Sequence, residues 1–219
     1  MGKRGPKPKK IVSERWNPEL AYAIGLLATD GGLSPRVHLI DLTSKDREQL
    51  ENYRRCLKIS TPITKKLGGN GKQYLRVQFK NVFFYNFLLS VGLTPAKSKT
   101  LGALKIPDKF FFDFLRGVFD GDGCTYSYWD PRWKSSFMLY SSVASSSPDF
   151  IGWLQDTLTK KLSIFGHITA TPQKHYQLRY AKTESLKLLK KMYAHPNCVC
   201  LGRKRLKIEK MLGIIGERL

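Results

Sequence analysis

Two short segments of the sequence each end an apolar run on an aspartate followed by glycine. LLATDGG spans residues 26–32, and VFDGDGC spans residues 118–124. A single Asp-Gly is ordinary turn chemistry, but two copies in the same context indicate a shared purpose. If both runs are helices, Asp30 and Asp122 stand at C-terminal ends, where the helix dipole already presents negative charge. Two carboxylates and helix-end carbonyls form an oxygen ligand set suited to Mg²⁺, so the pattern predicts a metal site.

Small residues predict that these two helices meet. Gly25 and Thr29 lie on one helical face at positions i and i+4, and Gly117 and Gly121 repeat this spacing in the second segment. Such pairs allow two helix backbones to approach closely. We therefore expect the helices to pack against each other and to bring Asp30 and Asp122 side by side.

The rest of the chain is expected to position this pair through two similar rounds of secondary structure. Periodicity and turn residues predict a first round with helices over 18–30, 45–57 and 81–92, strands over 36–43 and 73–80, a basic loop over 65–72, and Gly31-Gly32 as a helix C-cap. The second round has helices over 110–123, 148–162 and 182–193, extended segments over 135–147 and 175–182, and an aromatic, basic insertion at 126–134. This order predicts an α+β fold, a pseudo-twofold duplication of αββαββα halves with antiparallel sheets.

Three segments divide the chain. Residues 1–13 form a basic arm, which either lies on phosphates or in a minor groove or serves as a solubilising tail. Residues 14–104 form the N-terminal half and residues 105–219 the C-terminal half, with 91–107 as the crossover between them.

The charge balance indicates a polyanionic partner. The 219 residues include 38 Lys and Arg against 17 Asp and Glu, which leaves a net charge of +21. The 12 Phe, 10 Tyr and 4 Trp predict a substantial core, unlike a typical ribosomal protein. Nucleic acid is therefore the favoured partner, and a membrane surface is the weaker alternative.

The cysteines and the hydropathy pattern exclude other classes. Cys56, Cys124, Cys198 and Cys200 contain no CxxC pair, so reduced thiols are favoured over structural zinc, despite the nearby His195. No apolar run reaches the ~18 residues of a membrane helix, and no apolar segment follows the basic start. We expect an intracellular protein, in the cytoplasm of a prokaryote or in an organelle matrix.

The segments AIGLLATDG (23–31) and LRGVFDGDG (115–123) resemble the two motifs of single-chain LAGLIDADG homing endonucleases, and the resemblance covers residues ~14–219. It implies motif helices at the interface of the halves and Asp30 and Asp122 as ligands of Mg²⁺, with Mn²⁺ as a substitute. The carbonyls of Thr29 and Gly121 are implied as further ligands. Ala28 departs from the pattern where many members carry an earlier acid, which the second motif keeps as Asp120. Because that acid does not bind metal in the family, we expect no loss of activity.

The resemblance also implies further active-site residues. PAKSKT and GRKRLK match the segments that carry one basic residue per half, which indicates Lys97 in the first and Lys204 in the second, with Arg203 or Arg205 as substitutes for Lys204. A lysine beside a scissile phosphate can stabilise the charge of the transition state. Ser44 and Ser145 match a position that orients active-site water.

The predicted sheets offer a polar face for reading base edges in a major groove. In strand 73–80, Leu75, Val77 and Phe79 alternate with polar residues on the opposite face. The residues expected to contact DNA are Arg36, His38, Lys72, Gln73, Arg76, Gln78, Lys80, Arg132, Lys134, Lys174, His175, Gln177 and Arg179.

These features predict a monomeric endonuclease that hydrolyses both strands of a long, asymmetric double-stranded DNA target and needs no protein partner. The resemblance implies staggered cuts across the minor groove. The termini favour an intron-encoded or free-standing enzyme over an intein. Two alternatives keep the fold: an intron maturase that binds RNA, and a DNA-binding regulator that has lost cleavage.

Overall fold

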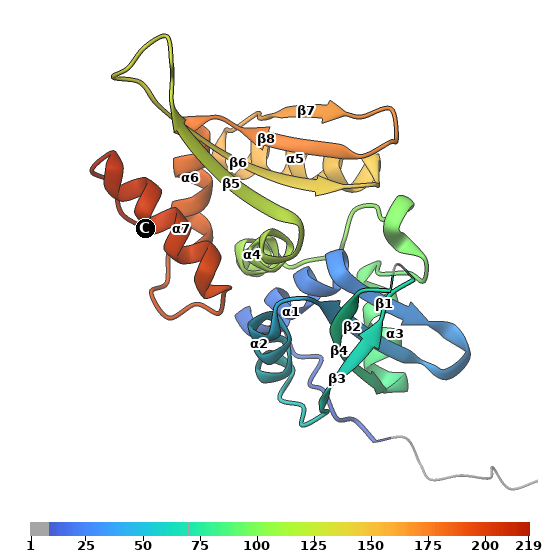
Figure 1. Cartoon of the computed structure of the whole chain (residues 1–219). Helices are drawn as coiled ribbons and strands as arrows, with labels where there is room; N and C mark the ends of the chain where they lie inside the picture. The colour runs from blue at the N-terminus through green and yellow to red at the C-terminus, as the bar shows by residue number, and fades with distance from the viewer. Residues whose placement is uncertain (1–8, 70) are drawn as a thin grey trace, which may run out of the picture.

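The protein is described by a computed structural model that covers residues 9–69 and 71–219 (Figure 1). Its elements form two αββαββα rounds followed by one further helix, so the predicted α+β duplication is confirmed. Residues 1–8 of the predicted basic arm lie outside the described part of the chain.

The N-terminal round builds one four-stranded antiparallel sheet in the order β1-β2-β4-β3. Its elements are α1 (Pro18–Asp30), β1 (Gly31–Ser34), the 3-10 turn η1 (Pro35–Val37), β2 (Leu39–Ser44), α2 (Arg47–Leu57), β3 (Ile63–Leu67), β4 (Gln73–Lys80) and α3 (Val82–Val91). Two further 3-10 turns, η2 (Lys97–Lys99) and η3 (Asp108–Phe110), lie in the crossover.

The C-terminal round repeats this plan with the sheet order β5-β6-β8-β7. Its elements are α4 (Phe111–Asp122), β5 (Gly123–Trp129), β6 (Phe137–Ser145), α5 (Pro148–Leu162), β7 (His167–Ala170), β8 (Tyr176–Tyr180) and α6 (Lys182–Met192), and α7 (Gly202–Ile214) follows. Helices α1 and α4 lie at the centre of the molecule between the two sheets (Figure 1).

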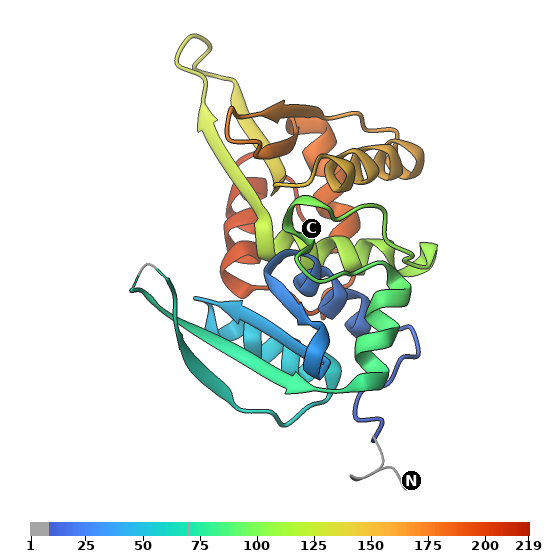
Figure 2. The same cartoon turned by 90° about the vertical axis from the view of Figure 1, so that its right-hand side faces the viewer.

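Strand alternation gives each sheet a core face and a free face. Ile40 and Leu42 on β2 and Val77 on β4 are buried, whereas their alternating neighbours face away from the helices. The β3–β4 and β5–β6 hairpins project on one side of the molecule, and α3 and α5 lie on the other (Figure 2). In the described part of the chain, no helix is both long and apolar enough to cross a bilayer.

The strand predicted over 36–43 begins too early, because β2 starts only at Leu39. Pro35 opens the turn η1, and His38 adopts a left-handed conformation with φ of 48° that breaks the strand. The basic segment predicted as a loop over 65–72 is also partly wrong, since Lys65 and Lys66 belong to β3.

Two further corrections concern glycine and the insertion. Gly31 is the C-cap residue of α1, as predicted, but it is not left-handed: its φ of −85° and ψ of 150° are extended, and it begins β1 directly. Glycine is required there because a Cβ would lie 2.6 Å from the Cα of Leu27. The segment 126–134 is not a separate loop, because residues 126–129 extend β5 and only the remainder forms the turn.

Candidate active site

The site begins with the contact between α1 and α4. A Cβ on Gly25 would lie 2.2 Å from the carbonyl oxygen of Phe114, and one on Gly117 would lie 2.1 Å from that of Tyr22. Near the C-terminal ends, a Cβ on Gly121 would lie 2.0 Å from Thr29 Oγ1. The backbones therefore touch through residues with minimal side chains, as the i and i+4 spacing predicted.

This contact places the two aspartates at adjacent helix ends. Asp30 is the last residue of α1, and Asp122 is the last residue of α4. Removal from water at the packed helix ends, followed by the charge of Asp30, raises the pKa of Asp122 to about 6, although its side chain still reaches solvent. Burial also raises the pKa of Asp30. The carboxylates are therefore close enough to repel each other.

Asp30 is held by an amide that the motif gave no reason to expect. Gln49 Nε2 donates to Asp30 Oδ2 at 2.9 Å, and Ser44 Oγ donates to Gln49 Oε1 at 2.7 Å. Ser44 also accepts from the backbone N–H of Asp46 at 3.0 Å, at the start of α2. Ser44 is therefore linked to the Asp30 carboxylate through Gln49.

The C-terminal half lacks this amide. Ser145 Oγ accepts from the backbone N–H of Ser147 at 3.1 Å, which repeats the contact of Ser44. Counting five residues onward, as from Ser44 to Gln49, reaches Phe150, a buried core residue on α5. Asp122 therefore has no counterpart to Gln49, and the two halves of the site differ chemically.

The two predicted lysines occupy matching positions. Lys97 Nζ donates to the carbonyl oxygen of Gly31 at 2.6 Å, and Lys204 Nζ donates to that of Gly123 at 2.7 Å. Each glycine directly follows its motif aspartate. Burial lowers the pKa of both lysines, while neighbouring aspartates oppose the shift. The structure therefore brings Lys97, Lys204, Asp30 and Asp122 to one centre.

Lys204 also closes the end of α4. Its ammonium donates to the carbonyl oxygens of Phe119 at 2.6 Å and Asp120 at 2.9 Å, with Gly121 at 3.5 Å. A cation at this point complements the C-terminal dipole of the helix. The carbonyl oxygen of Gly121, which is predicted to bind metal, therefore forms only a long hydrogen bond with Lys204.

Asp120 is buried and holds the start of α7. Its Oδ2 accepts from Tyr22 Oη and from the backbone N–H of Leu201, each at 2.7 Å. The same segment is tied to α2, because Gly202 N–H donates to Glu48 Oε1 at 3.0 Å. These contacts fix the helix that carries Lys204.

The donor set fits a hard divalent cation. In the described chain, neither motif carboxylate forms an ion pair with a lysine, arginine or histidine. Within the same described ranges, no group of three or more His, Cys, Asp or Glu side chains could hold a metal by itself. A metal here would rely on two carboxylates, backbone carbonyls and water, all oxygen donors as Mg²⁺ prefers.

A cavity opens beside this centre. It has a volume of about 440 Å³ and is lined by Asp30, Ser44, Gln49, Gly121 and Arg203, among others. Arg203 is already paired within this lining, since its Nε donates to Asp46 Oδ2 at 2.8 Å.

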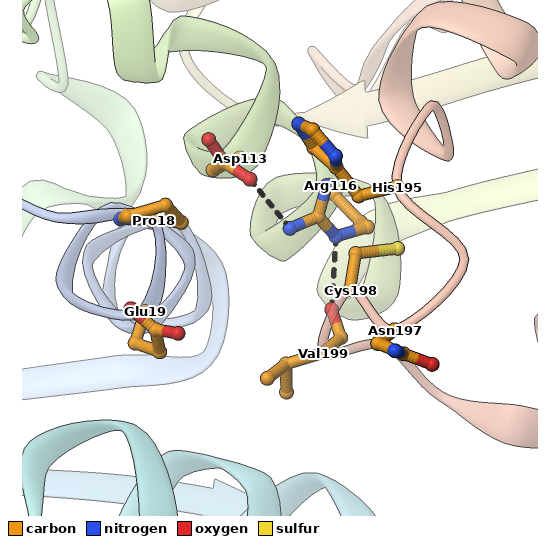
Figure 3. Close-up of a pocket in the computed structure, with 8 residues that line it drawn as sticks. All are labelled: Pro18, Glu19, Asp113, Arg116, His195, Asn197, Cys198 and Val199. Atoms are coloured by element: carbon orange, nitrogen blue, oxygen red, sulfur yellow. Dashed lines mark hydrogen bonds and ion pairs between the residues drawn. The ribbon is translucent and has the colours of Figure 1, made fainter.

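A second cavity, of about 290 Å³, lies where α1 and α4 begin (Figure 3). Each nitrogen of its buried Arg116 side chain has a partner: it donates to the carbonyls of Met192 at 2.5 Å and Val199 at 2.9 Å and pairs with Asp113 at 2.7 Å. Cys198 lines this cavity and remains a free thiol. Arg116 therefore ties α4 to the segment that follows α6, beside this cavity.

The predicted DNA contacts fall into three groups. Arg76, Gln78 and Lys80 alternate on β4, and Gln177 and Arg179 alternate on β8, all on the free faces. Residues at turns or strand ends are Lys72, Gln73, Arg132, Lys134, Lys174 and His175.

The third group departs from its predicted strand. Arg36 lies on η1, and the ring of His38 packs edge-on against Tyr85 at 5.2 Å. Neither residue is therefore on the free face of a strand. Arg132 is paired with Asp130 at 3.2 Å within its own turn.

Several site residues escaped the sequence analysis. Gln49 and the roles of Asp120 and Leu201 carry no spacing signal, because each depends on contacts between separate elements. When the two repeats are aligned, Phe150 occupies the position equivalent to Gln49, and this sequence difference marks the unequal support of Asp30 and Asp122.

Comparison with known proteins gives structural matches only. No protein-family model matches the chain, and no curated protein matches it in sequence. The LAGLIDADG meganuclease I-AabMI bound to uncleaved DNA has a TM-score of 0.61 at 15% identity, with 91% of this chain and 90% of that chain covered. Meganuclease I-SmaMI bound to uncleaveable DNA has a TM-score of 0.61 at 13% identity, covering 94% and 92%.

A further match is described only as a LAGLIDADG domain. The N-terminal domain of DUF199/WhiA has a TM-score of 0.55 at 15% identity, with 90% of this chain and 88% of that chain covered. A shared fold does not by itself carry a shared activity. The central glycine-packed helices, the paired terminal aspartates and the two antiparallel sheets together give this chain the two-repeat fold of the single-chain LAGLIDADG homing endonucleases.

Proposed function

We propose that the protein is a site-specific endonuclease that hydrolyses both strands of a long duplex DNA target with Mg²⁺. The observation that carries this proposal is the carboxylate pair at the touching ends of α1 and α4. No described cation neutralises either carboxylate through an ion pair, although burial and then the charge of Asp30 raise the pKa of Asp122.

Asp30 and Asp122 would hold the metal, with the carbonyls of Thr29 and Gly121 as further oxygen donors. When bound, Mg²⁺ supplies a water of lowered pKa and stabilises charge on the phosphate. Gln49 fixes the orientation of the Asp30 carboxylate through its hydrogen bond. The matched lysines, Lys97 and Lys204, add positive charge where negative charge develops during hydrolysis.

The remaining surface supports a long DNA target. Each sheet leaves one face uncovered by helices and presents polar side chains there. The net charge of +21 favours a polyanionic partner. One chain contains both halves of the carboxylate pair, which supports a monomeric enzyme.

The test begins with a randomised duplex library and purified protein in Mg²⁺ or Mn²⁺, followed by sequencing of the cut ends. We expect one preferred long site, cut in both strands. Asp30→Asn and Asp122→Asn should bind that site normally and fail to cut it. Asp156→Asn, an exposed change on α5, is the matched control and should cut at the normal rate.

The outcomes separate the proposal from its alternatives. Cutting by either motif variant at the normal rate contradicts the two-carboxylate centre. Specific binding without cutting under any divalent metal identifies a regulator, and preference for a structured RNA over duplex DNA identifies a maturase.

A further inference from the structure

The free faces of the two sheets carry different chemistry. In the N-terminal sheet, Arg76, Gln78 and Lys80 alternate with the buried Val77 and Phe79 of β4, and Lys66 on β3 lies opposite Tyr74 on the same face. The C-terminal sheet adds a series of three tyrosines and one methionine on β5 and β6. Its members, which we name the tyrosine strip, are Tyr126, Tyr128, Met138 and Tyr140.

The tyrosine strip is a continuous surface. Tyr126 lies directly opposite Tyr140, and Tyr128 lies opposite Met138. The Tyr126 and Tyr140 rings stack at 4.9 Å and 17°, and the Tyr128 and Tyr140 rings stack at 6.2 Å and 16°. Tyr128 is 44% exposed, on the hairpin that projects beyond the sheet (Figure 1). Stacking thus holds the rings in place, and Tyr126 and Tyr140 are also partly exposed.

The tyrosine strip also holds the guanidinium of Arg179 in place. Arg179 on β8 donates from Nη1 to Tyr126 Oη at 3.3 Å, and its guanidinium lies 5.6 Å from the centre of the Tyr140 ring. In the N-terminal sheet, by contrast, Arg76 Nε has no hydrogen-bond partner in the described structure. The two sheets therefore offer a polar, basic surface and an aromatic surface with one anchored arginine.

Each surface suits a different base edge. Thymine is distinguished in the major groove by its 5-methyl group, which is read by apolar contact. Cytosine presents an N4 amino donor instead, and covering that donor with an aromatic ring leaves it unsatisfied. An aromatic strip, whose rings can contact a methyl group, in a chain of net charge +21, therefore fits the thymine edges of a DNA groove.

We propose that the tyrosine strip reads thymine 5-methyl groups in the half of the target that the C-terminal sheet covers. This inference rests on the proposed function, since it assumes that the free faces bind duplex DNA. It adds methyl contacts to the polar contacts of Gln177 and Arg179 in the C-terminal half-site, whereas the N-terminal sheet relies on polar contacts.

The methyl group sets the expected size of the effect. Burying one such group contributes ~0.8 kcal/mol, which corresponds to a factor of about 4 in Kd at 25 °C. Replacing one contacted thymine with uracil deletes only the methyl group. Two contacted thymines therefore predict a loss of about 15-fold, if their effects add.

The experiment uses the full chain and the duplex selected from the library. Arg76→Ala identifies the half-site under the N-terminal sheet, because sequence preference should relax there. Uracil then replaces thymine in one half-site at a time, and Kd is measured by fluorescence anisotropy without divalent metal. We expect weaker binding for uracil in the C-terminal half-site and little change for uracil in the other.

Two variants link the effect to the strip. Tyr140→Ala removes the central ring and should make thymine and uracil duplexes bind equally. Tyr128→Ala, at an exposed position, should reduce the difference without threatening the fold, which circular dichroism checks for both variants.

The inference is overturned if uracil weakens binding equally in both half-sites. It is also overturned if both single variants, Tyr128→Ala and Tyr140→Ala, fold and still show the full difference in Kd between thymine and uracil duplexes. Such a result leaves the nuclease proposal intact if the selected duplex is still bound and cut. Failure to bind any duplex instead contradicts the proposed function itself.

Discussion

Replacing Gly117 with alanine should destabilise the protein and disable the site together. The new Cβ would lie 2.1 Å from the carbonyl oxygen of Tyr22 and 3.0 Å from the Cα of Gly25. Both obstacles are backbone atoms of α1, so no side chain can rotate away and the helices must separate. Overpacking of this kind costs ~3 kcal/mol, whereas alanine gains ~1 kcal/mol over glycine in a helix. The expected net loss is therefore ~2 kcal/mol.

Gly152 on α5 provides the matched control. A Cβ there would meet no atom within 4 Å, so Gly152→Ala should keep the helix gain of up to ~1 kcal/mol. The same substitution is thus expected to act with opposite sign at the two positions. For a chain of this size, Tm should fall by ~4–8 °C for Gly117→Ala and rise by ~2–4 °C for Gly152→Ala.

Urea unfolding followed by circular dichroism measures the two free energies, and cleavage of the selected duplex measures the site. Because separating α1 from α4 also separates Asp30 from Asp122, the folded Gly117→Ala protein should lose cleavage well below its unfolding temperature. Equal stability of the two variants would refute the close-packing argument. Normal cleavage by Gly117→Ala would show that the aspartates do not depend on that contact.

Three other perturbations follow from the same geometry. Asp122→Asn should raise Tm at neutral pH without metal, because the pKa of Asp122, about 6 in the folded protein, exceeds its unfolded value. The wild type regains this stability as pH falls from ~6 to ~4, so thermal scans across that range should show the Tm difference vanish. Asp120→Ala leaves the N–H of Leu201 and the hydroxyl of Tyr22 without their partner, so it should cost ~1–3 kcal/mol in urea unfolding and slow cleavage by displacing Lys204. Asp120→Asn retains an acceptor and should recover most of the stability and of the cleavage rate; equal damage from the two variants would contradict this role of Asp120. Binding should also be steeply salt-dependent, with a loss of ~10³ to 10⁵ in the binding constant between 50 and 200 mM salt for 6–10 phosphate contacts; a flat salt titration would contradict binding by the free faces.

The sequence alone determined the duplication and the central pair of helix ends. Apolar periodicity, the glycines at i and i+4 and the two Asp-Gly endings are local patterns, and their repetition removes the ambiguity of a single copy. The fold and the placement of Asp30 and Asp122 at adjacent helix ends could therefore be predicted before any coordinates. Strand limits were less accurate, because Pro35 and the left-handed His38 interrupt an otherwise regular alternation.

Only the tertiary structure decided how the centre is supported. Gln49 reaches Asp30 from α2, and Leu201 reaches Asp120 across 81 positions of sequence. Such contacts are set by the packing of whole elements, which no short-range pattern encodes. The same holds for the asymmetry between Gln49 and Phe150, since residues at matched positions acquire different roles only when one lies beside a carboxylate and the other in a core.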